Sequence, residues 1–221
     1  MRTTAAVRTF TAEPVPDEVL YRVIERARFA PSGGNRQGWR VIVVRDPELR
    51  GAVRDAYVLG WREYVGHLVQ GLVPFSPGLD GQWHAPAVDL EQARRIERPN
   101  ELADHLDQVP VMLLLCCDLG SLAVLDNGLP RQSIVGGGSV YPFGHNLLLS
   151  ARNEGLGGVM TTVICREEDA VRRLLHVPQG FAVAGLIALG HPQHQVSRLS
   201  RRAVEAFTTV DAFDGAPFSP S

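Results

Sequence analysis

The sequence predicts an α/β or α+β sandwich in which helices surround one sheet of about four or five strands. Segments with helical spacing of apolar residues alternate along the chain with short, β-branched apolar runs. The length of 221 residues suits a single large domain. A hydrophobic content of 45% and a charged content of 21% are ordinary for a protein that buries a core.

The first part of the chain predicts a helix, a strand and a second helix. Residues 16–30 carry apolar side chains at helical spacing, and Pro31 ends this helix. The run WRVIVV at 39–44 is apolar and β-branched enough for a buried strand. Residues 46–69 predict a helix that is broken at one of its two later glycines, Gly60 or Gly66.

The middle of the chain predicts a lid at about residues 58–100, which we treat as an insertion in the single domain. Its loop is rich in proline, glycine and aromatic residues, and a loop of this length is either functional or mobile. The aromatic side chains Tyr64, Phe75 and Trp83 either stack on a substrate or fill a small core of the lid itself.

The later part of the chain predicts the remaining elements of the sandwich. A short helix near 98–110 precedes a central strand, PVMLLLCCDL, and a glycine-containing loop then leads into a helix that ends before LGG. The run VMTTVIC at 159–165 predicts a strand, and a helix and a second buried strand follow it. The tail has no compact pattern, and we expect it to form a C-terminal arm at about residues 200–221.

Composition excludes several classes of function. A net charge of −2 gives no electrostatic reason to bind nucleic acid or a membrane surface. The three cysteines lie in apolar runs and have no zinc spacing, which is typical of reduced thiols in a cytoplasmic protein. The N-terminus lacks the apolar core of a secretion signal, and no apolar run is long enough to span a bilayer. The run SIVGGGS lacks the lysine of a phosphate-binding loop.

Four motifs in order along the chain resemble those of one family. They are Arg8-x-Phe10 with Val15, APSGGNRQGW at 30–39, NLLLSARNEGLGG at 146–158, and ALGHP followed by RLSRRAVEAF. This series resembles the nitroreductase family of flavin-dependent oxidoreductases and covers nearly the whole chain. The second and third motifs are specific when they occur together.

The resemblance implies an α+β, nitroreductase-like three-layer sandwich with a central, mostly antiparallel sheet. It also implies a homodimer that binds FMN in two clefts at the subunit interface, with the C-terminal arm exchanged between subunits. NADH or NADPH gives a hydride to the flavin and leaves, and a small-molecule acceptor then enters the same pocket. The implied function is therefore the ping-pong reduction of a small aromatic, nitro- or quinone-like acceptor.

The turn after the first helix is the first candidate part of a flavin site. Small residues allow a flat ligand to approach the backbone, and amide side chains can hydrogen-bond the ring and the ribityl chain. The candidate residues of this turn are Pro31, Ser32, Gly33, Asn35 and Gln37. The alternative is a turn that only ends the helix, with Asn35 as its cap. Arg36 and Gly38 depart from the family, which usually has a small polar residue and a proline there.

Phosphate binding requires arginines, and the chain has fewer of them than the family at its N-terminus. The resemblance maps Arg8 onto the N-terminal cluster, where Thr4 and Ala6 replace two family residues. It maps Arg201 and Arg202 onto a second, C-terminal cluster, with Arg201 favoured. The alternative for these last two is a solvated surface.

The strand after EGLGG is expected to face the reactive edge of the flavin. The resemblance implies that backbone N–H groups near Met160, Thr161 and Thr162 approach N5 and O4, although a threonine pair is also ordinary in a strand. No catalytic side chain and no metal are expected, because hydride transfer depends on distance and orientation.

Two other functions stay open at this point. The reduced N-terminal cluster and the missing proline in NRQGW also suit a flavin-binding protein with little turnover, which acts in storage or sequestration. A third interpretation is a related flavin-dependent reaction, such as dehalogenation or flavin destruction.

Overall fold

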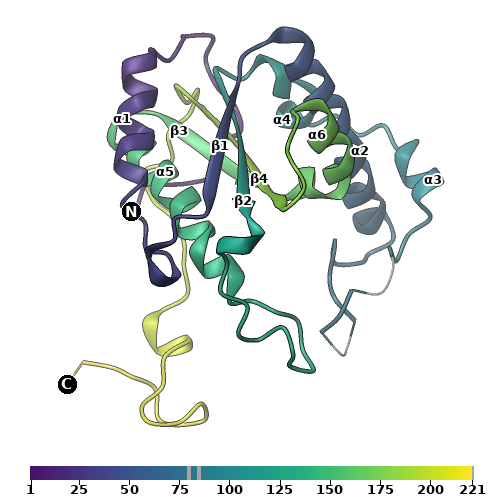
Figure 1. Cartoon of the computed structure of the whole chain (residues 1–221). Coiled ribbons are helices and arrows are strands. Elements are labelled where there is room, and N and C mark those ends of the chain that lie inside the picture. Colours follow the sequence, from purple (N-terminus) through teal and green to yellow (C-terminus); the bar gives the residue numbers. More distant parts are fainter. Residues whose placement is uncertain (79–80, 84–85, 221) are drawn as a thin grey trace.

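A four-stranded antiparallel sheet with the order β1-β2-β4-β3 forms the middle layer of the computed structural model (Figure 1). The strands are β1 (Trp39–Val44), β2 (Val111–Asp118), β3 (Gly157–Thr161) and β4 (Phe181–Gly190). The structure describes residues 1–78, 81–83 and 86–220. Within these residues the expected α+β sandwich is confirmed, with four strands.

Helices cover both faces of the sheet and complete the three layers (Figure 1). On one face lie α1 (Asp17–Ala27) and α5 (Tyr141–Asn153). On the other face lie α2 (Pro47–Val69), α4 (Glu101–Asp104) and α6 (Glu168–Leu174). The short helix α3 (Leu90–Arg94) packs on the outside of α2, where Ala93 contacts Gly66.

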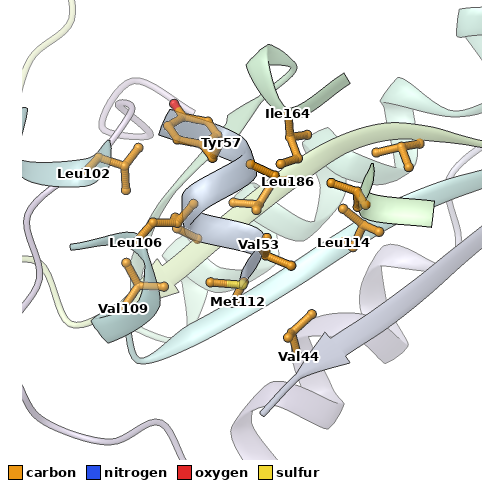
Figure 2. Close-up of a cluster of buried hydrophobic side chains, with 14 of the residues drawn as sticks. Val44, Val53, Tyr57, Leu102, Leu106, Val109, Met112, Leu114, Ile164 and Leu186 are labelled. Carbon is orange, nitrogen blue, oxygen red and sulfur yellow. The ribbon is translucent and has the colours of Figure 1, made fainter. Parts of the chain in front are cut away.

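The central strand β2 divides the hydrophobic core into two clusters. Met112 and Leu114 point toward α2, where Figure 2 shows them with Val53 and Leu186, whereas Leu113 and Leu115 point toward α1 and α5. Because β2 is buried on both faces, its sequence is continuously apolar and does not alternate. Each fully buried leucine contributes about 2 kcal/mol of transfer free energy.

Helix α2 is continuous, so the predicted break at Gly60 or Gly66 is wrong. Both glycines instead permit close contacts. A Cβ atom at Gly60 would lie 2.8 Å from the carbonyl oxygen of Val163, and one at Gly66 would lie 2.9 Å from Cβ of Ala93. Although α2 has 23 residues, neither it nor another helix in the described part of the chain is long and apolar enough to cross a membrane.

The strand predicted at 159–165 ends earlier, at Thr161, and residues Val163–Glu167 form a 3-10 helix, η5. The reason is the neighbouring strand β4, whose register shifts near Val183. The N–H group of Val183 donates to the carboxylate of Glu168 (2.7 Å), and its carbonyl accepts from the thiol of Cys165 (3.2 Å). These contacts use the backbone groups that a longer β3 would need as ladder partners.

The C-terminal arm runs away from the sandwich (Figure 1). It carries apolar side chains that this chain leaves uncovered. Within residues 200–220 the arm forms one helical turn, η6 (Val204–Ala206), and one isolated bridge joins Thr209 to Pro217. The exposed apolar residues of the arm are Val204, Phe207, Val210, Phe213 and Phe218. Exposed apolar side chains in series indicate a surface that another molecule covers.

Candidate functional site

The predicted site residues, together with Tyr57, which contacts one of them, form three separate groups in one chain. We call residues Pro31–Gln37 the turn. We call Arg8, Tyr57 and residues Met160–Thr162 the wall, and residues 200–220 the arm. The turn lies at the end of α1 and beside the start of α5, whereas the wall lies where β3 meets α2.

Short-range hydrogen bonds hold the turn. The hydroxyl of Ser32 accepts from the N–H group of Gln37 (3.0 Å), and the amide of Gln37 donates to the side-chain oxygen of Asn35 (3.2 Å). The N–H group of Gly33 donates to the buried hydroxyl of Ser139 (3.0 Å), just before α5. The turn is therefore anchored to the second helix of its layer, while Gly33, Asn35 and Gln37 stay exposed.

The backbone of the turn is strained. Gly34, Asn35 and Gln37 have φ angles of 61°, 53° and 51°, in the left-handed region. Glycine and asparagine tolerate this region, but for glutamine it costs about 1 kcal/mol. Such strain gathers at binding sites, where the surrounding structure fixes it. The conformation is compatible with a binding role and with a simple helix stop, so the binding role of the turn stays a prediction.

The two departures from the family, Arg36 and Gly38, both contact the segment after β2. A Cβ atom at Gly38 would lie 2.8 Å from Cβ of Ser121, so a side chain does not fit there. The guanidinium of Arg36 reaches the carbonyl oxygen of Leu122 (3.5 Å). In this chain Arg36 stands in place of the family's small polar residue and Gly38 in place of its proline. Both bring the turn into contact with residues 118–122.

The loop that supports the turn is organised around one buried carboxylate, Asp126. It accepts hydrogen bonds from the N–H group of Ile134, the hydroxyl of Ser133 and the guanidinium of Arg131, each at 2.8 Å. The backbone hydrogen bond from Ile134, followed by those from Arg131 and Ser133, holds the pKa of Asp126 well below its usual range. An ionised group therefore holds the loop that leads to Ser139.

A tyrosine of α2 joins the wall to the core. The hydroxyl of Tyr57 lies 3.3 Å from the hydroxyl of Thr161. The ring of Tyr57 packs in the hydrophobic cluster between the sheet and α2 (Figure 2). Burial raises the pKa of Tyr57, while the hydrogen bond with Thr161 and the charge of Arg8 oppose that shift. Tyr57 therefore stays a neutral hydrogen-bonding group beside a cation.

Arg8 is positioned by the backbone and keeps its side chain free. The N–H group of Val7 donates to the carbonyl of Gly158 (2.9 Å), which fixes the N-terminal segment beside β3. Within the described residues, the Arg8 side chain forms no hydrogen bond or ion pair. The family's N-terminal cluster has two further positions before Arg8, occupied here by Thr4 and Ala6. Ala6 supplies no polar group, and the hydroxyl of Thr4 is buried without a partner among the described residues.

The other wall residues offer mainly their backbone. The sulfur of Met160 packs under α5, where it would lie 2.7 Å from a Cβ at Gly144, so this side chain faces the core. Thr162 is exposed at the end of β3. Contact between the backbone of Met160–Thr162 and a ligand stays a prediction. The positions of the Met160 and Thr162 side chains are compatible with that contact.

The arm arginines contact only the arm. Arg201 donates to the carbonyl oxygen of Ser200 (2.7 Å), and the guanidinium of Arg202 lies 6.0 Å from the ring centre of Phe207. Among the residues that the structure describes, no hydrogen bond or ion pair joins the turn, the wall and the arm to one another. One chain thus presents three partial surfaces.

A cavity of about 850 Å³ lies at the start of α5, between the loop before this helix and β4. This size accommodates a drug-sized aromatic ligand. Tyr141 lines it and donates to the carbonyl of Ala184 (3.3 Å), which is freed by the register shift of β4. The cavity walls also include Ile134, His145 and the three glycines Gly136, Gly137 and Gly138.

Sequence reasoning missed Tyr57, Asp126 and a buried ion pair between Glu63 and Arg166 (3.0 Å). Tyr57 lies within the helix predicted at 46–69, and nothing in the sequence marks it as part of a site. A weak signal for the ion pair is present, because Glu63 lies three residues after Gly60 and six after Tyr57, on the face of α2 that the core covers. Nothing in the sequence singles out Asp126 among the loop residues.

A model of the nitroreductase family matches residues 1–191, and the chain belongs to this family. The solved structure of oxidised iodotyrosine deiodinase bound to FMN and 3-iodo-L-tyrosine aligns with 96% of this chain and 96% of that chain. The TM-score of this alignment is 0.65 and the sequence identity is 24%, which shows that the fold is shared.

Two curated relatives are equally similar to the chain but have different names. Iodotyrosine deiodinase 1 of Rattus norvegicus is 28% identical over 203 residues, or 90% of this chain and 64% of that protein. NADH dehydrogenase of Thermus thermophilus is 28% identical over 190 residues, or 86% of this chain and 83% of that protein. The chain thus spans less than two thirds of the deiodinase, and the family alone does not define its reaction.

Proposed function

We propose that the protein is an FMN-dependent oxidoreductase that uses NADH or NADPH to reduce a small aromatic, nitro- or quinone-like acceptor. The observation that carries this proposal is that the Arg8 guanidinium forms no hydrogen bond or ion pair with the described residues, while Val7 before it is hydrogen-bonded to β3. An anion or an electron-rich ring is the ligand that such a cation favours. The similarity to a protein named NADH dehydrogenase supports the same function.

The residues present fit FMN, with a small phosphate site. Arg8, Arg201 and Arg202 are cations, and each is exposed. The turn offers two amide side chains and a glycine surface for the ring, and the end of β3 offers backbone N–H groups. Bound FMN would supply hydride transfer between a nicotinamide and the acceptor.

The chain itself orients the ligand and excludes water, and no acid or base side chain is needed. The hydroxyl of Tyr57 keeps its proton and holds Thr161, which fixes the backbone at the end of β3. Hydrogen bonds to the hydroxyls of Ser32 and Ser139 keep the turn in one conformation, so less entropy is lost when the ring binds.

The complete site would need two copies of the chain. The turn and the wall are separate in one chain, and a homodimer would bring the turn of one subunit to the wall of the other. Exchange of the arm would bury its exposed phenylalanines and carry Arg201 and Arg202 to the partner's cleft. Residues 58–100 would form the lid of this single domain, and the three unpaired cysteines suit the cytoplasm.

A second candidate function is a flavin-binding protein with little turnover. The observation that favours it is the N-terminal phosphate site, where the hydroxyl of Thr4 is buried and Ala6 is apolar. A dehalogenation reaction is a further variant, because the similarity to iodotyrosine deiodinase 1 is as high as that to NADH dehydrogenase.

Cofactor uptake and reduction distinguish these functions. We expect the purified protein to bind FMN, and we expect NADH or NADPH to bleach the bound flavin without oxygen and an acceptor to restore its colour. A protein that takes up no added FMN would contradict every flavin function. Bound FMN that neither nicotinamide reduces would favour the non-catalytic function. A panel of nitro-, quinone and halogenated acceptors would distinguish a reductase from a dehalogenating enzyme.

Removal of Arg8 is the residue-level test. We expect Arg8→Ala to raise the Kd for FMN by roughly 10- to 100-fold, because a charge-assisted hydrogen bond contributes about 1.5–3 kcal/mol. Arg201→Ala should weaken FMN binding in the same direction. Arg28→Ala is the matched control, because Arg28 is also exposed but pairs with Glu25 on α1. Unchanged affinity in both variants would show that the phosphate lies elsewhere.

A further inference from the structure

Two consecutive residues at the end of η5, Arg166 and Glu167, both contact the lid. The guanidinium of Arg166 donates from Nε to the carboxylate of Glu63 (3.0 Å). Glu167 accepts from the guanidinium of Arg94 on α3 (2.6 Å). One short 3-10 helix thus binds the lid through α2 and also through α3, on either side of the loop.

Two aromatic rings of the lid loop pack on Arg166. Its guanidinium carbon lies 5.8 Å from the ring centre of Phe75 and 5.5 Å from that of Trp83. The two ring centres are 6.2 Å apart, and Phe75 also contacts His67 (5.4 Å). A guanidinium over aromatic faces is a cation–π arrangement, which arginine favours because its head group is planar.

The ion pair beneath the rings is largely removed from water. The side chain of Glu63 is 5% exposed and that of Arg166 is 32% exposed. The second oxygen of Glu63 is buried without a partner, so Arg166 is the only cation that neutralises this carboxylate among the described residues. Removal of one partner from such a pair leaves an uncompensated charge, which is costly.

The same face of α2 connects these contacts to the wall. Tyr57, Gly60 and Glu63 follow one another at intervals of three residues. The first contacts Thr161, the second lies against Val163, and the third binds Arg166. Because η5 begins immediately after Thr162, the lid and the end of β3 are held by one continuous set of contacts.

We propose that Arg166 and Glu167 form a clamp that fixes the lid to the wall and so limits the size of the acceptor that reaches it. Both are positioning residues, since they act through Phe75, Trp83 and Arg94. The effect on the acceptor rests on the proposed reductase function, whereas the clamp itself does not. When the clamp is broken, the lid loop becomes accessible while the sandwich stays folded.

Limited digestion with chymotrypsin tests the clamp on the full chain without any cofactor. Chymotrypsin cleaves after Phe75 and Trp83, the two residues that pack on Arg166. We expect Arg166→Met to raise the rate of cleavage at these sites, measured by mass spectrometry, by about tenfold. Arg166→Lys keeps a charge for Glu63 but loses the planar stacking, so it stays folded and should give a smaller increase, about threefold.

The matched control is Arg95→Met, which removes an exposed lid arginine that pairs with Glu91 within the lid. We expect this variant to be digested like the wild type. Wild-type cleavage rates in both Arg166 variants would overturn the clamp, as would an equal increase in Arg95→Met. If Arg166→Met does not fold, the rate of Arg166→Lys decides between these outcomes.

Acceptor kinetics test the second part of the proposal. We expect Arg166→Lys to raise kcat/KM for a bulky quinone relative to a small one by about threefold, through KM and not kcat, with unchanged FMN affinity. An unchanged ratio in a variant whose lid is digested faster would contradict the control of acceptor size and leave the clamp intact. A wild-type protein without reductase activity would instead contradict the proposed function.

Discussion

The turn and the wall are held in place by different forces. The turn is exposed, its backbone is strained, and its supports are polar: Ser139, Arg36 and the loop around the ionised Asp126. The wall is the rim of a packed core, fixed by Tyr57 and by the close approach of Gly60 to Val163. We therefore expect substitutions that disturb packing to damage the wall. Substitutions that change a charge or the backbone conformation should damage the turn.

The largest expected effect is on the wall side. We expect Gly60→Val to lower the free energy of unfolding by about 3 kcal/mol, because the new side chain meets the carbonyl oxygen of Val163. Urea denaturation measures this change. Gly51→Val is the matched control in the same helix, since a Cβ atom at Gly51 meets nothing within 4 Å. Equal stability of the two variants would mean that α2 and η5 are not closely packed.

A smaller effect is expected in the turn. Gly34→Ala places a side chain at a φ of 61° and should lower the free energy of unfolding by about 1 kcal/mol. The control is Gly138→Ala, at a glycine without a left-handed backbone and without a neighbour within 4 Å. If urea denaturation finds Gly34→Ala as stable as the control, the left-handed conformation of the turn is wrong.

The smallest expected effect is a pH dependence on the turn side. The pKa of Asp126 is lowered in the folded protein, so its contribution to stability is complete above the ordinary value of 3.8 and is lost as the pH falls further. We therefore expect Asp126→Asn to be less stable than the wild type at pH 7, with a narrower difference near pH 3. A difference that is the same at both pH values would contradict the ionised anchor.

Much of the fold could be predicted from the sequence, because apolar spacing and β-branched runs are local signals. Helix α1, the doubly buried β2 and the position of β1 follow from their own residues. The expected burial of β1 is wrong in one chain, because β1 is an edge strand and only Val44 in it is buried. The end of β3 could not be predicted, since it depends on Glu168 and Cys165 taking the backbone groups of Val183. The role of Gly60 could not be predicted either. Glycine is a poor helix former, and only the structure shows that this one allows close contact between α2 and Val163.

The sequence indicates candidate residues for the site, but it does not indicate the contacts that hold them in place. The turn residues stand out because small and amide side chains are consecutive in the sequence. Tyr57 and Thr161 are distant in sequence, and only the fold shows that their hydroxyls lie 3.3 Å apart. Asp126 and the Glu63–Arg166 pair became visible only from burial and hydrogen bonding.

The central claim is that two copies of the chain build each flavin site, one giving the turn and the other the wall. The most direct measurement is FMN binding by a purified heterodimer of Arg8→Glu, a wall variant, with Gly33→Phe, a turn variant. Each variant alone should bind FMN poorly. In the heterodimer one site carries both defects and the other carries neither, so about half of the sites should bind FMN as the wild type does. A heterodimer that binds no more FMN than either variant alone would contradict the account.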